Sequence, residues 1–391
     1  MVPPETPTEQ QLVDAWAKVL RVGSAQISRD DDFMDLGGHS LLMTQLMVAV
    51  RKLFGVSFSM RDFFAASTLR KFAALIDELK RVPAHEAATY LALHARDSEF
   101  AKSRMTFLRR EAELPPGIVP ARGLTFTPTR ARTALLTGAT GFLGAYIVAE
   151  VLRSTDVHLH CLVRPKQGAD SKARIASQLK TYELWRDDPA WQAAFAERVH
   201  VVAGDVILPR LGLDDDTHEA LAREIDCIIH SAAHVNFIYP YEALKTTNVL
   251  GLHEIIRFGL HGRIKPVHYL STAAIWPMGS EQTFYESDSL DHGKLLNLGY
   301  DEAKWVGERC LVNAAERGLP VARYRPGEVG GDSQSGRSVL NHFLIAAFKG
   351  FLQYGAFPPI DTHVDVAPVD YVAKALVHMA FHGNPLGRAD W

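Results

Sequence analysis

Tyr300 and Lys304 are a phenol and an ammonium whose spacing suits proton transfer. They are four residues apart, so a helix would place both side chains on one face. A phenol is a weak acid with an ordinary pKa of about 10, and a nearby cation favours its ionised form. The pair could therefore exchange a proton with a reacting oxygen atom. The same spacing often arises by chance, and in isolation it would indicate only two surface side chains without a chemical role.

Thr272 gives this pair a context. It follows an apolar stretch, 267–271, that we expect to form a strand. Open α/β sheets bind their ligands at the carboxyl ends of the strands. We therefore predict that Thr272, Tyr300 and Lys304 converge on one carbonyl group of a substrate.

A glycine-rich turn lies between an expected strand, 133–137, and an expected helix, 145–152. Its glycines would let the chain turn tightly and let a pyrophosphate approach the amides at the helix N-terminus. An incidental turn is the alternative, but a strand and a helix on either side favour a dinucleotide site. The predicted cofactor contacts of this turn are Thr137, Gly138, Thr140, Gly141, Phe142, Leu143 and Gly144.

The residue that follows the second expected strand, 157–163, indicates which nicotinamide cofactor fits. An acid at this position would bind the ribose 2′-hydroxyl of NAD, whereas an arginine suits the 2′-phosphate of NADP. The chain has Arg164 here, with no acid beside it. Lys166, Lys172 and Arg174 could add positive potential, although each alone is more often a solvated surface charge. The sequence favours NADPH, with Arg164 and Arg174 as candidate contacts.

Ser40 is a second centre of possible chemistry, far from the first. It follows Gly37 and Gly38 at the expected start of a helix, where a modifying enzyme could reach its hydroxyl. An ordinary helix N-cap is the alternative. Apolar residues at helical spacing predict helices at 10–22, 41–54 and 69–79, the last with Thr68 as N-cap, and a short helical turn at 60–65.

The segment 31–41, with Asp35-Leu36-Gly37-Gly38-His39-Ser40-Leu41 at its centre, strongly resembles the peptidyl carrier domains of nonribosomal peptide synthetases. The resemblance implies a four-helix carrier bundle in which Ser40 receives 4′-phosphopantetheine. It also suggests that Leu41, Met43 and Met47 face partner domains, with core packing as the alternative for each.

The GxxGxxG spacing resembles the extended short-chain dehydrogenase/reductases. That resemblance implies that Thr272 binds the substrate oxygen, Tyr300 protonates it, and Lys304 lowers the phenol pKa while binding the nicotinamide ribose. It implies structural support from Asn248 and a substrate region at 361–373. It assigns further cofactor contacts to Gly204, Asp205 and Val206 near the adenine, to Ser231, Ala232 and Ala233 near the ribose and pyrophosphate, and to Asn248, Pro326 and Val329.

The order of these segments predicts a multidomain chain. Strands expected at 133–137, 157–163, 199–203, 227–230, 267–271 and 321–325 alternate with amphipathic helices, which predicts a doubly wound parallel sheet of Rossmann type. We expect a carrier domain at 6–82, a partly helix-prone linker at 83–131 and a reductase domain at 132–391, with a small C-terminal substrate region.

Composition excludes several other classes of protein. The 391 residues are 47% hydrophobic and 22% charged with a net charge of −3, which indicates soluble globular domains and no basic surface for nucleic acid. No long apolar segment or signal peptide is present, so we expect a cytoplasmic protein without a membrane partner. Cys161, Cys227 and Cys310 lack metal-ligand spacing and are expected to be packing residues. His230 and His234 lie outside any HExxH pattern, and we predict packing for both and no metal site.

Together, the two motifs resemble the C-terminal end of a nonribosomal peptide synthetase, an aminoadipate reductase or a carboxylic acid reductase. This resemblance implies that a thioester on the Ser40 arm is reduced by NADPH to an aldehyde, with further reduction to the alcohol left open. The implied partners are upstream adenylation and condensation domains, a phosphopantetheinyl transferase and an acyl or peptidyl thioester substrate. It also implies that the family continues beyond Trp391, so that the reductase would be C-terminally truncated.

Other modes of action remain as alternatives. Non-redox release, by Dieckmann-type cyclisation or hydrolysis, occurs in reductase-like domains that typically lack the tyrosine, whereas Tyr300 is present. A thioesterase would need a GxSxG nucleophile turn, which the sequence lacks. A docking module that only binds nucleotide would not need the Thr272, Tyr300 and Lys304 set, and a sugar-nucleotide epimerase would not need Ser40.

Overall fold

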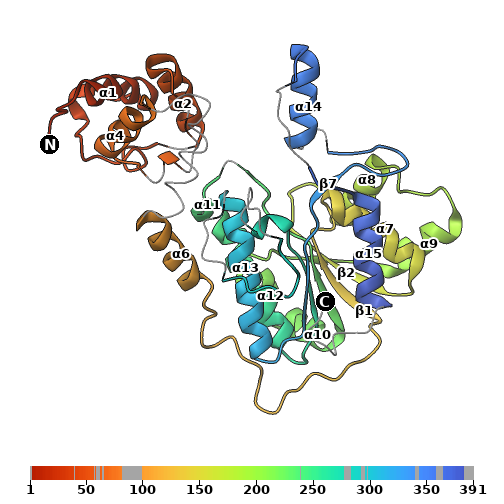
Figure 1. Ribbon diagram of the computed structural model, residues 1–391. Helices are drawn as coiled ribbons and strands as arrows, with labels where there is room; N and C mark the ends of the chain where they lie inside the picture. The colour runs from red at the N-terminus through yellow and green to blue at the C-terminus, as the bar shows by residue number, and fades with distance from the viewer. Residues whose placement is uncertain are drawn as a thin grey trace. The chain divides into compact units, whose positions relative to one another are not determined.

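The computed structural model describes residues 2–38, 40–56, 58, 62–63, 66–81, 99–237, 239–276, 283–291, 296, 298–339, 343–357 and 364–382. The chain divides into two compact units (Figure 1). One comprises Met1–Arg110 with Phe237–Tyr239 and Asp291–Gly299, and the other comprises Glu111–Asn236, Pro240–Leu290 and Tyr300–Trp391. No helix among the described residues is long and apolar enough to cross a membrane.

The N-terminal unit contains the predicted helical carrier bundle. Its helices are α1 (Pro7–Leu20), α2 (Ser40–Phe54) and α4 (Leu69–Leu79), joined in part by a 3₁₀ turn, η1 (Ser24–Gln26). Helix α1 begins earlier than predicted because Thr6 and Glu9 form a capping box, in which the Glu9 amide donates to the Thr6 hydroxyl at 3.1 Å. Thr68 is the N-cap residue of α4 but makes no side-chain cap bond. Most of the predicted turn at 60–65 lies outside the described residues, and Asp62 and Phe63 are helical.

Aromatic side chains hold this bundle together. Phe33 packs edge-on against Trp16 at 5.1 Å between ring centroids and against Phe63 at 5.4 Å. Phe63 also packs edge-on against Phe72 at 4.7 Å. Such edge-on ring pairs stabilise the bundle beyond the contribution from burying their large apolar surfaces. Met43 is fully buried in the same core, so it packs in the interior and does not face a partner.

The second unit is built around six parallel strands in the order β3-β2-β1-β4-β5-β6. Their bounds are β1 (Thr133–Thr137), β2 (His158–Val163), β3 (Val199–Ala203), β4 (Cys227–His230), β5 (Val267–Leu270) and β6 (Val321–Tyr324). The order reverses beside β1, where Thr137 pairs with Leu162 on one side and His230 on the other. The predicted doubly wound sheet is confirmed, and its switch point lies at the glycine-rich turn.

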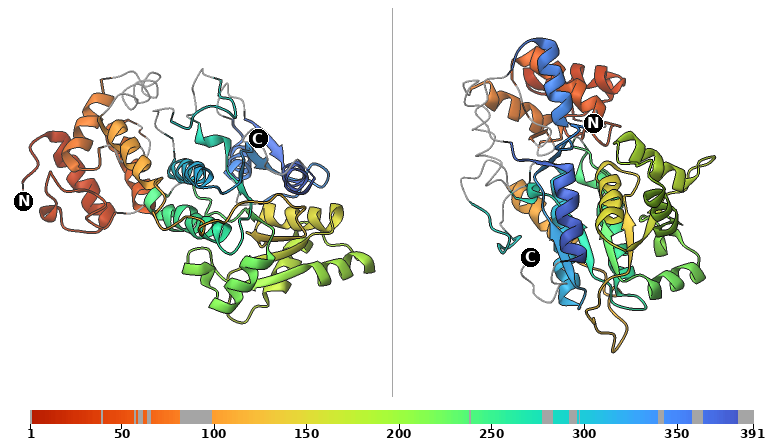
Figure 2. Two further views of the ribbon diagram at one scale, coloured as in Figure 1. Left: turned by 90° about the horizontal axis from the view of Figure 1, so that it is seen from below. Right: turned by 90° about the vertical axis from the view of Figure 1, so that its right-hand side faces the viewer.

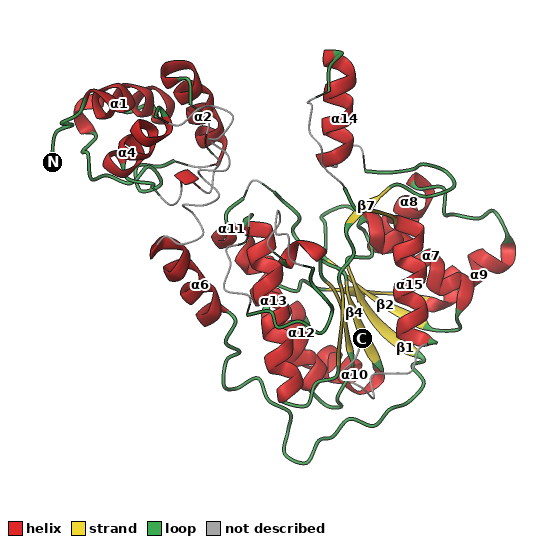
Figure 3. Cartoon of the chain, viewed as in Figure 1, coloured by secondary structure: helices red, strands yellow, loops and turns green. Residues whose placement is uncertain are grey.

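Helices cover both faces of this sheet (Figures 1 and 2). On one face lie α7 (Phe142–Ser154), α8 (Ser171–Thr181), α9 (Pro189–Arg198) and α15 (Val369–Phe381). On the other lie α10 (Asp215–Glu224), α12 (Gly251–Leu260) and α13 (Gly299–Glu316). This unit also contains α11 (Tyr241–Lys245), α14 (Phe343–Tyr354) and a two-stranded parallel sheet of β7 (Glu328–Gly330) and β8 (Val366–Pro368) (Figure 3). Because both faces are covered, the strands are largely apolar.

The three cysteines are packing residues, as predicted. Cys161, Cys227 and Cys310 are buried and form no disulfide bond. Burial raises the pKa of each thiol to about 12, which keeps it neutral.

The region between the two predicted domains is partly structured. Helix α6 (Glu99–Glu111) ends before Pro115 and Pro116. The following residues pack on the second unit, with Ala112, Leu114 and Ile118 buried. The Arg317 guanidinium donates to the carbonyl oxygens of Leu114 at 3.0 Å and of Pro115 and Ile118 at 2.8 Å. Residues 112–118 are therefore bound to the chain that follows α13.

Candidate active site

The turn between β1 and α7 accepts only glycine at its closest contacts. Gly138 has φ +82°, and a Cβ atom there would lie 2.9 Å from the Ala232 amide nitrogen. A Cβ atom at Gly144 would lie 2.0 Å from the Gly138 carbonyl oxygen. The turn closes through the Gly141 amide, which donates to the Gly138 carbonyl at 2.8 Å. This close packing aims the first amides of α7 outward from the switch point, where a pyrophosphate fits.

Thr137 joins this turn to the end of β4. Its buried hydroxyl lies 2.8 Å from Nδ1 of His230 and accepts a hydrogen bond from the Ala232 amide at 3.1 Å. Burial, together with the charge of Lys304, lowers the pKa of His230 to about 3, so the imidazole is neutral. His230 is thus a packing residue, as predicted. His234 is exposed, contrary to the prediction that it packs.

Asn248 supports the segment after β4. It lies in a π-helical turn, η3 (Thr246–Leu250), and is buried. Its side chain accepts from the His234 amide at 2.7 Å and donates to the His234 carbonyl at 3.0 Å. These two bonds hold the main chain just beyond Ser231, Ala232 and Ala233, which are all half-buried.

The ends of β2 and β3 form the other side of the turn. The Arg174 guanidinium donates to the carbonyl of Arg164 at 2.7 Å, so the exposed Arg164 and the half-buried Arg174 lie together after β2. After β3, the Asp205 amide donates to the Leu211 carbonyl at 2.8 Å. A Cβ atom at Gly204 would lie 2.4 Å from the same carbonyl oxygen, which requires glycine there. Val206 packs against Gly251 at the start of α12.

Lys304 and Tyr300 are brought to the end of β5 by α13. The Lys304 ammonium donates to the carbonyl of Leu270, the last residue of β5, at 2.6 Å. It lies 5.9 Å from the centroid of the Tyr300 ring, one helical turn away. Thr272 is two residues beyond Leu270 and caps a 3₁₀ turn, η4 (Ala273–Ile275), by accepting from the Ala274 amide at 3.2 Å. The three predicted residues therefore gather at one end of one strand.

Burial dominates the electrostatics of this group. It raises the pKa of the Tyr300 phenol, aided by the charges of Asp301 and Glu328, so the phenol carries its proton. It lowers the pKa of Lys304 to about 7, and the charge of Glu308 opposes that shift. The structure thus provides a neutral proton donor beside an amine that titrates near neutral pH.

The segment after β6 borders the same site. The carbonyl of Pro326 accepts from the Ala273 amide at 2.9 Å, which joins this segment to the turn that Thr272 caps. Val329 follows in β7 and is half-buried. The side chains of Ser40 and His39 lie outside the described residues, and the main chain of Ser40 begins α2.

Sequence reasoning missed Glu308, which is fully buried between Lys304 and two arginines. Its position four residues after Lys304 was a signal that could have been used, because i and i+4 side chains share a helix face.

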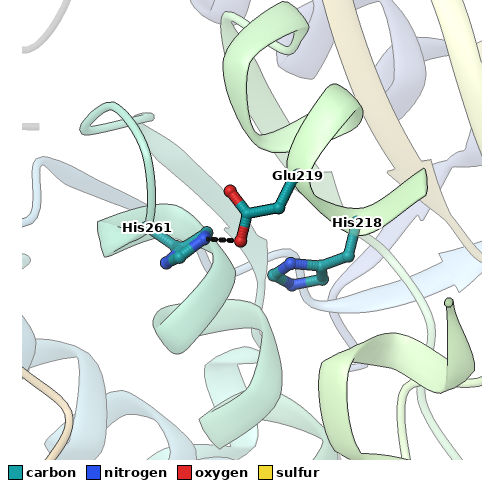
Figure 4. A group of neighbouring side chains, drawn as sticks. All are labelled: His218, Glu219 and His261. Carbon is teal, nitrogen blue, oxygen red and sulfur yellow. Dashed lines mark hydrogen bonds and ion pairs between the residues drawn. The ribbon is translucent and has the colours of Figure 1, made fainter. Parts of the chain in front are cut away.

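Among the described residues, one group of side chains has the spacing of metal ligands. His218, Glu219 and His261 have ligand atoms within 4.8 Å of one another (Figure 4). His261 Nε2 lies 2.6 Å from Glu219 Oε1, and the same carboxylate is 3.6 Å from Arg210 and 3.9 Å from Arg223. These cations disfavour a bound metal ion, and we assign the group to holding α10 against the end of α12.

Comparisons with known proteins match both halves of the chain. Residues 136–376 match the family described as "Male sterility protein", and residues 10–76 match the "Phosphopantetheine attachment site" family. The chain is 36% identical to a subunit of the linear gramicidin synthase of Brevibacillus parabrevis over 97% of its own length and 7% of that protein. It is 34% identical to the L-2-aminoadipate reductase large subunit of Penicillium chrysogenum over 97% of its own length and 28% of that protein. The chain thus spans a minor part of these relatives.

The chain is also similar to solved structures. The terminal R domain from the myxalamid PKS-NRPS biosynthetic pathway matches with 38% identity and a TM-score of 0.68 over 73% of this chain and 72% of that one. A thiolation-reductase di-domain from an archaeal non-ribosomal peptide synthetase matches with a TM-score of 0.68 over 98% of this chain and 77% of that one. Its sequence is 22% identical, so it supports the fold alone.

Proposed function

Because the chain belongs to the carrier–reductase didomains of nonribosomal peptide synthetases, which are related to aminoadipate reductases, we propose that it releases an acyl or peptidyl thioester by reduction with NADPH. It is an NAD(P)-dependent oxidoreductase with an attached carrier domain. We take 6–82 as the carrier, 83–131 as the linker and 132–391 as the reductase. The product proposed is an aldehyde.

The observation that carries this proposal is the arrangement at the end of β5. Lys304 donates to the carbonyl of Leu270, Tyr300 lies one turn away on α13, and Thr272 follows two residues after the end of the same strand. A reacting carbonyl placed here meets a hydroxyl, a protonated phenol and an amine. Such donors stabilise the negative charge that develops on the oxygen when hydride adds to the carbon.

The glycine turn fits a dinucleotide. The space that a side chain would fill at Gly138 and Gly144 is occupied by neighbouring backbone atoms, so the amides at the start of α7 stay accessible to a pyrophosphate. When bound, NADPH would supply the hydride. Arg164 and Arg174 after β2 would hold its 2′-phosphate, because guanidinium groups suit phosphate and no carboxylate follows the strand directly.

The chain's own residues account for the proton balance. The thioester carbonyl gains one hydride at carbon and one proton, from Tyr300, at oxygen, which gives a hemithioacetal. That species collapses when its hydroxyl proton leaves and the carbon–sulfur bond breaks, which gives the aldehyde and the carrier thiol. We propose that the thiol belongs to 4′-phosphopantetheine on Ser40, attached by a phosphopantetheinyl transferase, and that upstream adenylation and condensation domains load it.

The test uses the full chain with Ser40 loaded by an acyl-pantetheine and follows the nicotinamide absorbance and the released product. We expect oxidation of NADPH, much slower oxidation of NADH, and aldehyde in equal amount. Tyr300→Phe should reduce the rate by about 10²-fold or more, as loss of a general acid does. Loss of the acyl group without NADPH oxidation would instead show hydrolysis or cyclisation and would reject the proposal.

A further inference from the structure

Glu308 is a carboxylate with no exposed surface, in the middle of α13. Its Oε2 atom lies 2.6 Å from Nη2 of Arg325, and Arg325 Nε approaches both carboxylate oxygens at 2.9 and 3.1 Å. Arg323 adds a contact at 3.3 Å. A buried charge is tolerated only when it is paired in this way, and an apolar pair of similar size would often be no less stable. Stability alone therefore gives little reason for this ion pair.

The position of Glu308 links it to Lys304. The two residues are one helical turn apart on α13, and both are buried. The groups around the Lys304 ammonium are uncharged: the Tyr300 ring on α13 at 5.9 Å, the Tyr269 ring on β5 at 4.6 Å and the neutral His230 on β4. Of the charged groups further out, Asp301 on α13 and Glu328 on β7 act on the Tyr300 phenol, whereas Arg323 in β6 and Arg325 just after it pair with Glu308. The charge of Glu308 thus favours the protonated form of Lys304, whereas burial of the amine favours the neutral form.

Arg325 extends the ion pair to the segment that follows Thr272. Its Nη1 atom donates to the carbonyl of Glu286 at 3.3 Å, and its guanidinium lies 5.4 Å from the centroid of the Trp276 ring. Trp276 in turn stacks on Phe284 at 4.7 Å, with the rings nearly parallel. One arginine therefore contacts the chain on both sides of 277–282.

We propose that Glu308 is a positioning residue of the reduction: its carboxylate keeps Lys304 charged for the cofactor ribose, and its Arg325 partner fixes the segment that carries Thr272. This role rests on the proposed function, because it assigns Lys304 to the nicotinamide cofactor. The role also goes beyond the proposed function, because it places the control of the Lys304 charge on a residue that contacts neither substrate nor cofactor.

The proposal predicts a pH dependence of cofactor binding. Lys304 is protonated below about pH 7, and above it the neutral amine loses its attraction for the cofactor. Binding of NADPH should therefore weaken above that pH. Removing the Glu308 charge makes the ammonium less favourable, so the break should move down by about one pH unit, which corresponds to about tenfold weaker binding on the alkaline side.

The experiment measures the dissociation constant of NADPH by its fluorescence from pH 5.5 to 8.5, without thioester, in the wild type and in Glu308→Gln. Glu316→Gln, an exposed carboxylate at the end of the same helix, is the matched control and should leave the break in place. Glu308→Asp keeps the negative charge, so its break should lie close to that of the wild type. A break at the same pH in wild type and Glu308→Gln would overturn the proposal.

A second variant separates electrostatics from folding. Glu308→Gln leaves Arg323 and Arg325 without their carboxylate partner and destabilises the fold, whereas the double variant Glu308→Gln/Arg325→Met also removes the guanidinium that makes the closest contacts. The double variant should recover thermal stability but keep the lowered break. If stability and break recover together, Glu308 is merely structural. Because no thioester is present, failure of the reduction assay would leave this result standing and would count against the proposed function alone.

Discussion

Arg317→Ala should loosen the attachment of segment 112–118 to the reductase. Arg317 donates three hydrogen bonds to the carbonyls of Leu114, Pro115 and Ile118. A net value of about 1 kcal/mol for each bond gives about 3 kcal/mol in total. Leu114 and Ile118 remain buried and contribute roughly 1.5–3 kcal/mol each, so the segment should open more often without being lost from the surface altogether.

The assay is amide hydrogen exchange across 112–118. Since about 1.4 kcal/mol corresponds to tenfold in an equilibrium, a loss of about 3 kcal/mol should accelerate exchange there by roughly 10²-fold. Arg122→Ala is the matched control, because Arg122 is exposed four residues beyond this segment and the structure gives it no hydrogen bond or ion pair. Exchange that rises less than about threefold in Arg317→Ala would refute the hydrogen-bond account and leave apolar packing as the sole anchor.

The same variant tests how the linker sets the reach of the carrier. Release of the segment lengthens the free chain between carrier and reductase, and the effective concentration of a tethered substrate falls with tether length. Turnover of a carrier-bound thioester should therefore decrease in Arg317→Ala in proportion to the time that the segment spends open, while reduction of a free pantetheine thioester stays unchanged. Equal losses for both substrates would indicate damage to the reductase instead.

Two further perturbations have expected outcomes. Gly144→Ala places a methyl group 2.0 Å from the Gly138 carbonyl oxygen, so the NADPH affinity should fall at least tenfold and the melting temperature should drop. The control is Gly350→Ala, whose new methyl group would have no atom within 4 Å and should stabilise α14 by about 0.5–1 kcal/mol. An unchanged NADPH affinity in Gly144→Ala would contradict the packing argument. Burial lowers the pKa of His230 to about 3 and of His268 to about 4, so below the unfolded pKa near 6.5 the unfolded state binds more protons and the unfolding free energy falls as the pH drops toward 4. Each histidine contributes about 1.4 kcal/mol of unfolding free energy per pH unit in this range. Urea titrations at pH 6 and 5 should show that His268→Phe depends less steeply on pH than the wild type, by one proton taken up on unfolding. An equal pH dependence in the two proteins would contradict a neutral buried imidazole.

Features set by local patterning were predictable from the sequence. The six strands lie within one residue of their predicted bounds because each is a short apolar run between turn residues, and the parallel order follows from their alternation with helices. The early start of α1 was missed although Thr6 and Glu9 carry the capping-box spacing, because the prediction relied on apolar periodicity, which begins later. For Met43 the expected core packing is confirmed, although its position three residues after Ser40 does not by itself reveal on which side of α2 the side chain lies.

Features set by register between distant elements were not predictable. Thr272, Tyr300 and Lys304 could be grouped because strand ends and an i,i+4 spacing are visible in the sequence. The pairing of Glu308 with Arg325 depends on how far α13 is rotated against β6, and nothing in either segment alone encodes that rotation. The anchoring of 112–118 by Arg317 depends likewise on a contact between residues about two hundred positions apart.

This difference has a chemical consequence for the proposed reaction. The groups that would touch the substrate are set by type and spacing, so similar sets can occur on many chains that share the fold. The pKa of Lys304 depends on burial and on Glu308, which are products of packing. Two chains with the same Thr, Tyr and Lys pattern can therefore differ in the pH at which they bind the cofactor, and a substitution in β6 that displaces Arg325 should change that pH without altering any residue in contact with the substrate.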